Sequence, residues 1–158
     1  MKKFEFTGET KTISLLFRTA TLHRIRAVAE FGLVKIGDLG GWIEKEENLS
    51  HEGKAWVCGD AEVWGNAKVC GDAKVFSASH VLVIGAIGSR DDFTTFFRDK
   101  DNEITVKCGC FLGKIDKFLE KVTQTHGDSK YALVYRAAVE VARLQIDLSG
   151  EAPKDADE

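Results

Sequence analysis

A glycine-rich turn contains the residues best suited to bind an anion. The segment GAIGSR follows an apolar stretch of strand character and contains Gly85, Gly88, Ser89 and Arg90. Glycines let backbone N–H groups approach a phosphate, and a hydroxyl and a guanidinium add further donors. The segment matches neither GxxxxGK[ST] nor GxGxxG, the two common phosphate-loop patterns. A plain turn at the end of a strand is therefore the alternative interpretation.

Other polar and aromatic side chains extend this set farther along the chain. Thr94 and Arg98 share one face of an expected strand, because side chains alternate between the two faces. The aromatic ring of Tyr131, or alternatively that of Trp42, is suited to stack on the planar base of a ligand. His126 ends an expected helix, where a structural cap is the alternative to a ligand contact. The predicted ligand-binding residues are Gly88, Ser89, Arg90, Thr94, Arg98, His126 and Tyr131.

The cysteines do not predict a metal site. Cys108 and Cys110 flank one glycine, which places their thiols about 7 Å apart on one side of a strand. Structural zinc sites use cysteines two to four residues apart together with a second pair of ligands. Cys58 and Cys70 have no histidine or cysteine close by in sequence, so small buried apolar residues explain all four thiols better. We expect neither a metal nor another cofactor.

Four consecutive hexads determine the predicted fold. VCGDAE, VWGNAK, VCGDAK and VFSASH run from residue 57 to 80 with a valine every six positions. Gly-Asp and Gly-Asn suit tight corners, and a strict short period indicates a stacked repeat unit. The period resembles the hexapeptide repeat of left-handed parallel β-helices. If the position after each valine faces outward, it forms an exposed apolar row, which indicates a subunit interface and, for this fold family, a homotrimer. This row consists of Cys58, Trp64, Cys70 and Phe76.

Beyond the hexads the pattern changes to that of a small α+β module. Residues 93–98 and 103–111 predict a hairpin, and two amphipathic helices follow, separated by Gly127. The predicted fold is therefore a short left-handed parallel β-helix followed by an α+β module. We divide the chain into residues 1–88 with the β-helix, 89–148 with the α+β module, and a disordered acidic tail at 149–158.

Composition excludes several classes of protein. The 158 residues are 44% hydrophobic and 30% charged, which is ordinary for a globular protein. A net charge of -3 argues against a dedicated nucleic-acid binder. The chain has neither a long apolar run nor a signal segment after Met1, so we expect a cytoplasmic protein with reduced thiols and no membrane contact.

Longer segments of the chain resemble accessory proteins of tailed phages and prophages. The similarity lies in LHRIRA, GDLGGWIEKEENLSHEGKAWV, the hexads, GSRDDFTTFFR, VKCGCFLGKIDKFLEKV and THGDSKYA. The resemblance does not assign a catalytic or binding role to any residue of this sequence. It implies action in the cytosol of an infected host and an accessory role during infection.

These observations predict a non-enzymatic oligomer that sequesters a small phosphate-bearing ligand, such as a nucleotide signal of host defence. Neither a Ser-His-Asp order nor a pair of catalytic carboxylates stands out. One alternative is an adaptor that binds a host protein through residues 89–148, with the β-helix as a trimerising scaffold. The other is an enzyme resembling hexapeptide acyltransferases, with His80 or His51 as its catalytic base.

Overall fold

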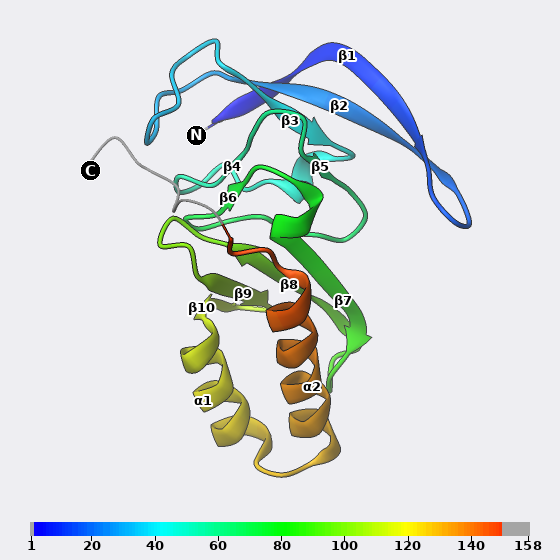
Figure 1. The fold of residues 1–158 in the computed structure, drawn as a ribbon, viewed down its shortest axis with the longest axis vertical. Coiled ribbons are helices and arrows are strands. Elements are labelled where there is room, and N and C mark those ends of the chain that lie inside the picture. The colour runs from blue at the N-terminus through cyan, green and yellow to red at the C-terminus, as the bar shows by residue number, and fades with distance from the viewer. Residues whose placement is uncertain (1, 150–158) are drawn as a thin grey trace.

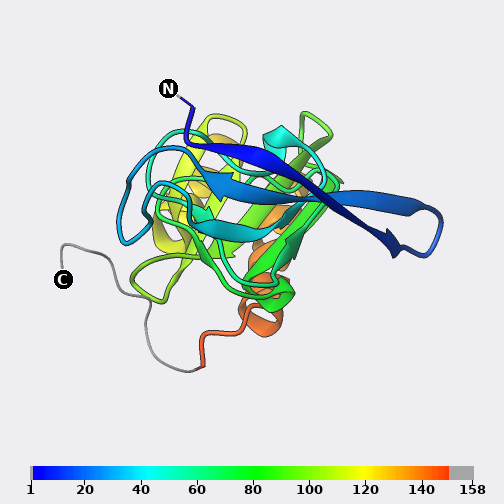
Figure 2. The same cartoon turned by 90° about the horizontal axis from the view of Figure 1, so that it is seen from above.

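The computed structural model describes residues 2–149, which begin with a long hairpin. Strands β1 (Phe4–Ser14) and β2 (Thr19–Ala27) pair antiparallel and reach beyond the rest of the molecule (Figures 1 and 2). At their base Phe4 and Ile25 are fully buried in the hydrophobic core that also contains the valines of the hexads, which we call the valine core. At the tip Leu16 and Phe17 are 87% and 94% exposed. Apolar packing thus holds the base of the hairpin and, through Ala20 and Leu22, part of its length, whereas the two large apolar side chains at its tip are exposed.

The hexads contribute very short strands next to this hairpin. Strand β3 (Leu39–Ile43) pairs antiparallel with β2 and parallel with β5 (Glu62–Val63), giving the sheet order β1-β2-β3-β5. Strands β4 (Trp56–Val57) and β6 (Lys74–Val75) form a separate parallel pair. The four repeat valines are all buried in one core, as the period of six predicts: Val57, Val63, Val69 and Val75.

The predicted left-handed β-helix is wrong. The chain forms a mixed four-stranded sheet, an antiparallel four-stranded sheet and one two-stranded pair, not a solenoid. The fourth hexad lacks the Gly-Asp corner, and its Ser77 hydroxyl instead accepts a hydrogen bond from the Ser79 backbone at a 3-10 turn, η2 (Ala78–His80). Strand β3 also lies tightly between the hairpin and the start of the repeat: a Cβ on Gly40 of β3 would lie 2.7 Å from side-chain atoms of Ile25 in β2 and Trp56 in β4. The repeat is therefore too short and too closely covered to continue as a helix of strands.

The exposed apolar row expected after each valine is not continuous. Cys58 and Cys70 are half-buried against the valine core, and Trp64 packs on a small cluster formed by Leu22 and Trp42. Only Phe76 of the four is exposed. Burial raises the pKa of the Cys58 thiol to about 11. The apolar face from which the trimer is predicted is mostly used inside the molecule.

The second sheet is antiparallel throughout. Its strands are β7 (Val81–Ile87), β8 (Asp92–Arg98), β9 (Ile104–Cys108) and β10 (Phe111–Lys114), in the order β10-β9-β8-β7. The predicted hairpin is confirmed as β8 and β9, which pair antiparallel.

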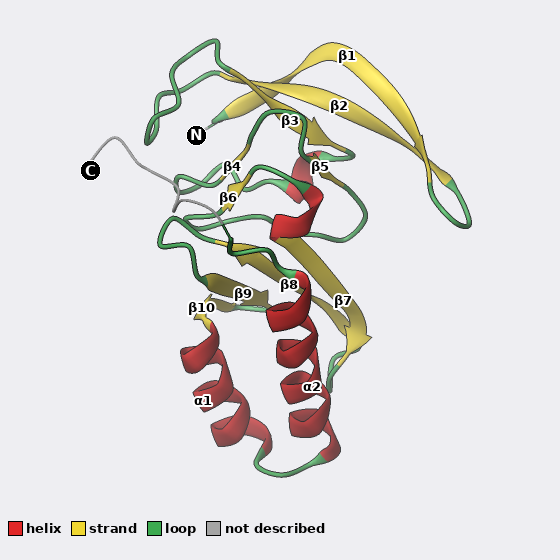
Figure 3. Ribbon diagram, viewed as in Figure 1, coloured by secondary structure: helices red, strands yellow, loops and turns green. Residues whose placement is uncertain are grey.

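Two helices cover one face of this second sheet (Figures 1 and 3). They are α1 (Ile115–His126), which ends at Gly127 as predicted, and α2 (Lys130–Gln145). The second sheet and the two helices enclose a second hydrophobic core, which we call the helical core. Phe96 packs in the helical core, whereas its neighbour Phe97 packs in the valine core, because successive strand residues point to opposite faces. The second sheet therefore separates two hydrophobic cores. The predicted disordered tail lies, except for Ser149, outside the described residues.

Neither helix in the described part of the chain has the length and apolar character needed to cross a membrane.

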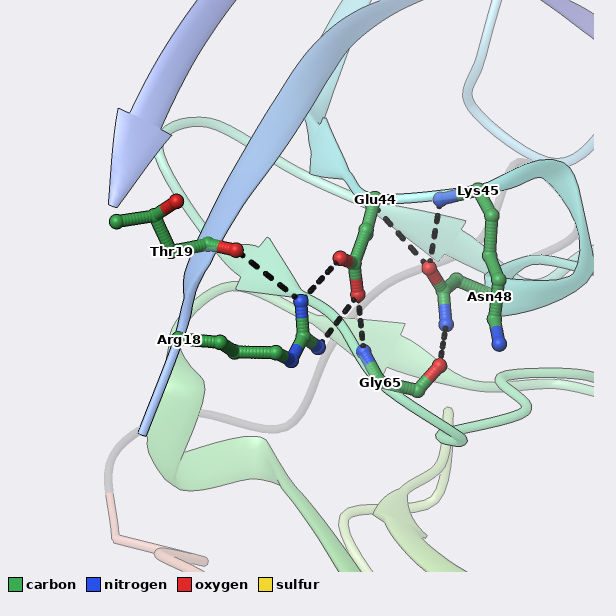
Figure 4. Close-up of polar contacts among 6 residues, drawn as sticks. All are labelled: Arg18, Thr19, Glu44, Lys45, Asn48 and Gly65. Atoms are coloured by element: carbon green, nitrogen blue, oxygen red, sulfur yellow. Dashed lines mark hydrogen bonds and ion pairs between the residues drawn. The ribbon is translucent and has the colours of Figure 1, made fainter. Parts of the chain in front are cut away.

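A partly exposed polar cluster links the hairpin to the hexads (Figure 4). The Arg18 guanidinium donates to both carboxylate oxygens of Glu44, at 2.6 and 3.0 Å, and the Gly65 backbone N–H donates to Glu44 Oε1 at 2.8 Å. These bonds, that from Arg18 first, lower the pKa of Glu44 to about 2. The hairpin turn and a hexad corner are thus linked through one carboxylate.

Because the pKa of Glu44 is lowered in the folded protein, we expect the protein to lose stability in acid. Glu44 is ionised in the folded protein down to about pH 2, whereas its ordinary pKa is 4.5. Its contribution is complete above pH 4.5 and is lost as the pH falls towards 2. We expect roughly 1 kcal/mol, because the partner Arg18 is partly exposed and the pair is screened by solvent.

Urea unfolding at pH 6 and at pH 2.5 measures this contribution. Glu44→Gln is expected to reduce the difference in unfolding free energy between the two pH values, and Glu47→Gln, at an exposed neighbouring position, is expected to leave it unchanged. An unaltered difference in Glu44→Gln would contradict the assignment.

Candidate functional site

A cavity of about 340 Å³ lies at the end of the molecule that contains the helices. Its walls come from the turn after β7, the start of β8, the β9–β10 turn, and facing sides of α1 and α2. The lining residues are Ser89, Arg90, Asp92, Cys108, Gly109, Cys110, Phe111, Phe118, Lys121, Val122, Thr125, His126 and Tyr135. The cavity therefore brings together residues from five successive segments between Ser89 and Tyr135.

Three of the predicted site residues line this cavity. Ser89 and Arg90 enter from the turn after β7, and His126 enters from the last turn of α1. Gly88 lies directly behind them with a φ of +79°. A Cβ at Gly88 would overlap the Tyr135 hydroxyl, so this glycine is required both by backbone conformation and by space.

Two predicted residues lie elsewhere on β8. Thr94 is buried, and its hydroxyl donates to the Cys108 thiol at 3.4 Å behind the cavity wall. Arg98 is buried at the other end of the strand, where its Nε donates to the Lys74 carbonyl at 3.2 Å and its guanidinium lies over the Phe76 ring. Arg98 thus joins β8 to the fourth hexad and does not reach the cavity.

Tyr131 lies at the edge of the site. It is 44% exposed near the start of α2, and its ring centroid is 5.7 Å from that of His126. His126 also stacks on Tyr135 at 5.7 Å with an interplanar angle of 28°. The two tyrosines therefore hold the imidazole between α1 and α2. Trp42, the alternative stacking residue, is buried in the first half of the chain.

Several lining residues were missed by sequence reasoning. Phe118, Lys121, Val122 and Thr125 follow the helical spacing i, i+3, i+4, i+7, which reveals one face of α1 but not what that face meets. Tyr135 lies on α2, and the sequence analysis did not assign it to the site. Burial raises the pKa of Tyr135 to about 12, and the neighbouring Cys108 adds to this effect. Its hydroxyl therefore keeps its proton at neutral pH and can donate a hydrogen bond.

The charges around the cavity favour an anion. Arg90 and Lys121 supply two cations, against one carboxylate from Asp92. Phe111, Phe118 and Tyr135 supply an aromatic wall. A ligand with an anionic group and a planar ring satisfies both parts of this lining.

The other histidines are tied to the fold. His80 is buried, and its Nδ1 accepts a hydrogen bond from the Phe76 backbone at 3.0 Å. Burial, with Arg98 nearby, lowers the pKa of His80. His51 accepts from the Lys3 backbone at 3.0 Å and stacks on Phe4. The two candidates for the catalytic base of an acyltransferase thus have structural partners and do not line the cavity.

Across residues 2–149, no three His, Cys, Asp or Glu side chains converge as a metal site would require. No protein-family model matches this chain, and no curated protein matches it either.

Proposed function

We propose that this protein binds a small phosphate-bearing, nucleotide-like ligand in the cavity and releases it unchanged. The observation that supports this most strongly is the pairing of Arg90 and Lys121 with an aromatic wall that includes Phe118 and Tyr135. The guanidinium and ammonium groups bind phosphate oxygens, and the rings bind the face of a base. The volume of 340 Å³ falls within the range of small-molecule sites, about 300–1,000 Å³.

The biological setting of this proposal comes from the resemblance to accessory proteins of tailed phages. In the cytosol of an infected cell, a protein that captures a nucleotide signal lowers its free concentration and so opposes host defence. Cyclic dinucleotides and ADP-ribose derivatives combine phosphates with planar bases, which is the chemistry that the cavity lining favours.

Ligand capture is tested directly with a panel of cyclic dinucleotides and ADP-ribose species. Each compound is incubated with the purified protein, the free fraction is removed, and the bound fraction is released by heat and identified by chromatography. We expect one compound to be depleted and recovered intact. Recovery as a product would identify an enzyme, and the absence of depletion across the panel would contradict the proposal.

Arg90→Ala is expected to weaken binding of the captured compound by roughly ten- to a hundredfold, since a hydrogen bond to a charged group contributes about 1.5–3 kcal/mol. Lys121→Ala is expected to weaken binding as well. Lys117→Ala is the matched control, because Lys117 lies one turn earlier on α1, pairs with Glu120 and does not line the cavity. Isothermal titration calorimetry measures all three. Equal affinities for Arg90→Ala and the parent protein would remove the turn after β7 from the site.

A further inference from the structure

The carboxylate that lines the cavity has no partner of opposite charge. Asp92 begins β8, and both it and Arg90 line the cavity, whereas Asp91 between them does not. Within residues 2–149 the Asp92 carboxylate forms no ion pair, and its one hydrogen bond comes from the Phe93 backbone to Oδ1 at 2.7 Å. Each carboxylate oxygen has two lone pairs, so both oxygens can still accept hydrogen bonds from a ligand.

Charges of both signs therefore face the same ligand space. A phosphate is attracted by Arg90 and Lys121 and repelled by Asp92, so Asp92 is left to meet a different part of the ligand, one that carries hydrogen-bond donors. Asp92 also lies beside the aromatic wall: burial and Cys108 raise the pKa of Tyr135, Arg90 lowers it and Asp92 raises it. Because a base stacks on this wall, the donors that Asp92 meets are those at the edge of the base.

The edges of the common bases differ in what they offer to a carboxylate. Guanine alone presents two neighbouring N–H donors, N1–H and the N2 amino group, which match the two oxygens of a carboxylate. Adenine and cytosine present one amino group beside a ring nitrogen that is an acceptor, and uracil presents one N–H between two carbonyls. An acceptor placed against a carboxylate is repelled and loses its own hydrogen bond to water.

We propose that Asp92 selects guanine, by accepting hydrogen bonds from N1–H and the N2 amino group while Arg90 and Lys121 bind the phosphate. This inference rests on the nucleotide binding proposed above and narrows its ligand class. A guanine nucleotide such as cyclic di-GMP is the expected occupant, in preference to cyclic di-AMP or ADP-ribose, whose base is adenine.

Isothermal titration calorimetry of the full chain with GDP, IDP and ADP tests this selection. The three compounds share their ribose and phosphates, so differences in affinity report the base alone. We expect ADP to bind about tenfold more weakly than GDP, because a site that is built to pair with two donors leaves its carboxylate unsatisfied by adenine. IDP retains N1–H but lacks the N2 amino group, so its affinity is expected to lie between the other two. Cyclic di-GMP and cyclic di-AMP form a second matched pair.

Asp92→Asn keeps the shape of the side chain but replaces one acceptor oxygen with a donor. The substitution also removes a negative charge from the cavity, which favours every nucleotide equally, so the ratio of the GDP and ADP affinities is the informative quantity. We expect this ratio to fall about tenfold, because the amide can pair with the amino group and ring nitrogen of adenine. Asp91→Asn is the matched control: Asp91 does not line the cavity, and its φ of 47° suits asparagine, so the ratio is expected to stay unchanged.

The outcomes separate this inference from the proposal on which it rests. A preference for GDP that Asp92→Asn abolishes and Asp91→Asn retains supports the assignment. Equal binding of GDP and ADP by the parent protein, or an unchanged ratio in Asp92→Asn, would overturn it and leave nucleotide binding intact. Equal weakening of all three diphosphates in Asp92→Asn would place Asp92 at the ribose and overturn it as well. Absence of binding by every nucleotide would contradict the proposed function itself and this inference with it.

Discussion

Asn48→Ala is expected to lower the free energy of unfolding by about 3 kcal/mol, among the largest effects of any single substitution in this chain. Asn48 is fully buried at the end of a 3-10 turn, η1 (Glu46–Asn48). Its Nδ2 donates to the carbonyls of Gly65 and Ala67 at 3.0 and 2.9 Å, and its Oδ1 accepts from the backbones of Glu44 and Lys45 at 3.2 and 2.9 Å. Removal of this amide leaves buried backbone groups without partners (Figure 4).

Urea or thermal unfolding measures the effect against two further variants. Asn66→Ala changes an exposed asparagine beside Gly65 and is expected to change stability by less than about 0.5 kcal/mol. Asn48→Asp keeps the shape but replaces the donor with a carboxylate oxygen that faces the carbonyls of Gly65 and Ala67, so it is expected to destabilise at least as much as Asn48→Ala. If Asn48→Asp were as stable as the parent protein, the proposed donor role of Nδ2 would be wrong.

Gly88→Ala is expected to destabilise the protein by about 3 kcal/mol and to distort the cavity. The residue has a φ of +79°, a conformation that costs an alanine about 1 kcal/mol. The added methyl group also overlaps the Tyr135 hydroxyl, and forcing a buried ring aside costs about 1–3 kcal/mol. Because Tyr135 is part of the cavity lining, ligand binding is expected to fall together with stability.

A matched glycine separates the two causes. Gly59 has a φ of +57°, and a Cβ there would meet nothing within 4 Å, so Gly59→Ala is expected to show the backbone cost alone. In a double-mutant cycle, Gly88→Ala combined with Tyr135→Ala is expected to be less destabilising than the sum of the single changes. Equal unfolding free energies for Gly88→Ala and Gly59→Ala would show that Tyr135 does not press on position 88.

Local patterns predicted the second half of the chain because the interactions there are local. The hairpin of β8 and β9 has its turn residues between its strands, and α1 and α2 have an apolar face and a glycine between them. In the hexads the same kind of reasoning was right about the buried valines and wrong about the fold. The period fixes which side chains are buried, but not whether the strands continue as a solenoid or end after two residues beneath a hairpin.

The candidate site was predictable only in part for a related reason. Ser89 and Arg90 were found because a glycine-rich turn after a strand is a local signal, and His126 because it ends a helix. Lys121 and Tyr135 belong to the same cavity through the packing of two helices on a sheet, which leaves no mark in the spacing of residues. Arg98 lies on the same face of β8 as Thr94, yet its guanidinium donates to the Lys74 carbonyl near the hexads and does not reach the cavity.

The sequence by itself determined the buried valines, the β8–β9 hairpin and both helices. The tertiary structure alone decided that the hexad strands pair with β3 and with each other over two residues only, and that Lys121, Tyr135 and the turn after β7 share one cavity. The physical reason is the separation in sequence over which each kind of interaction acts. Periodicity and turn chemistry act over a few residues, whereas strand partners and cavity walls are chosen by the burial of apolar surface between segments far apart in the chain.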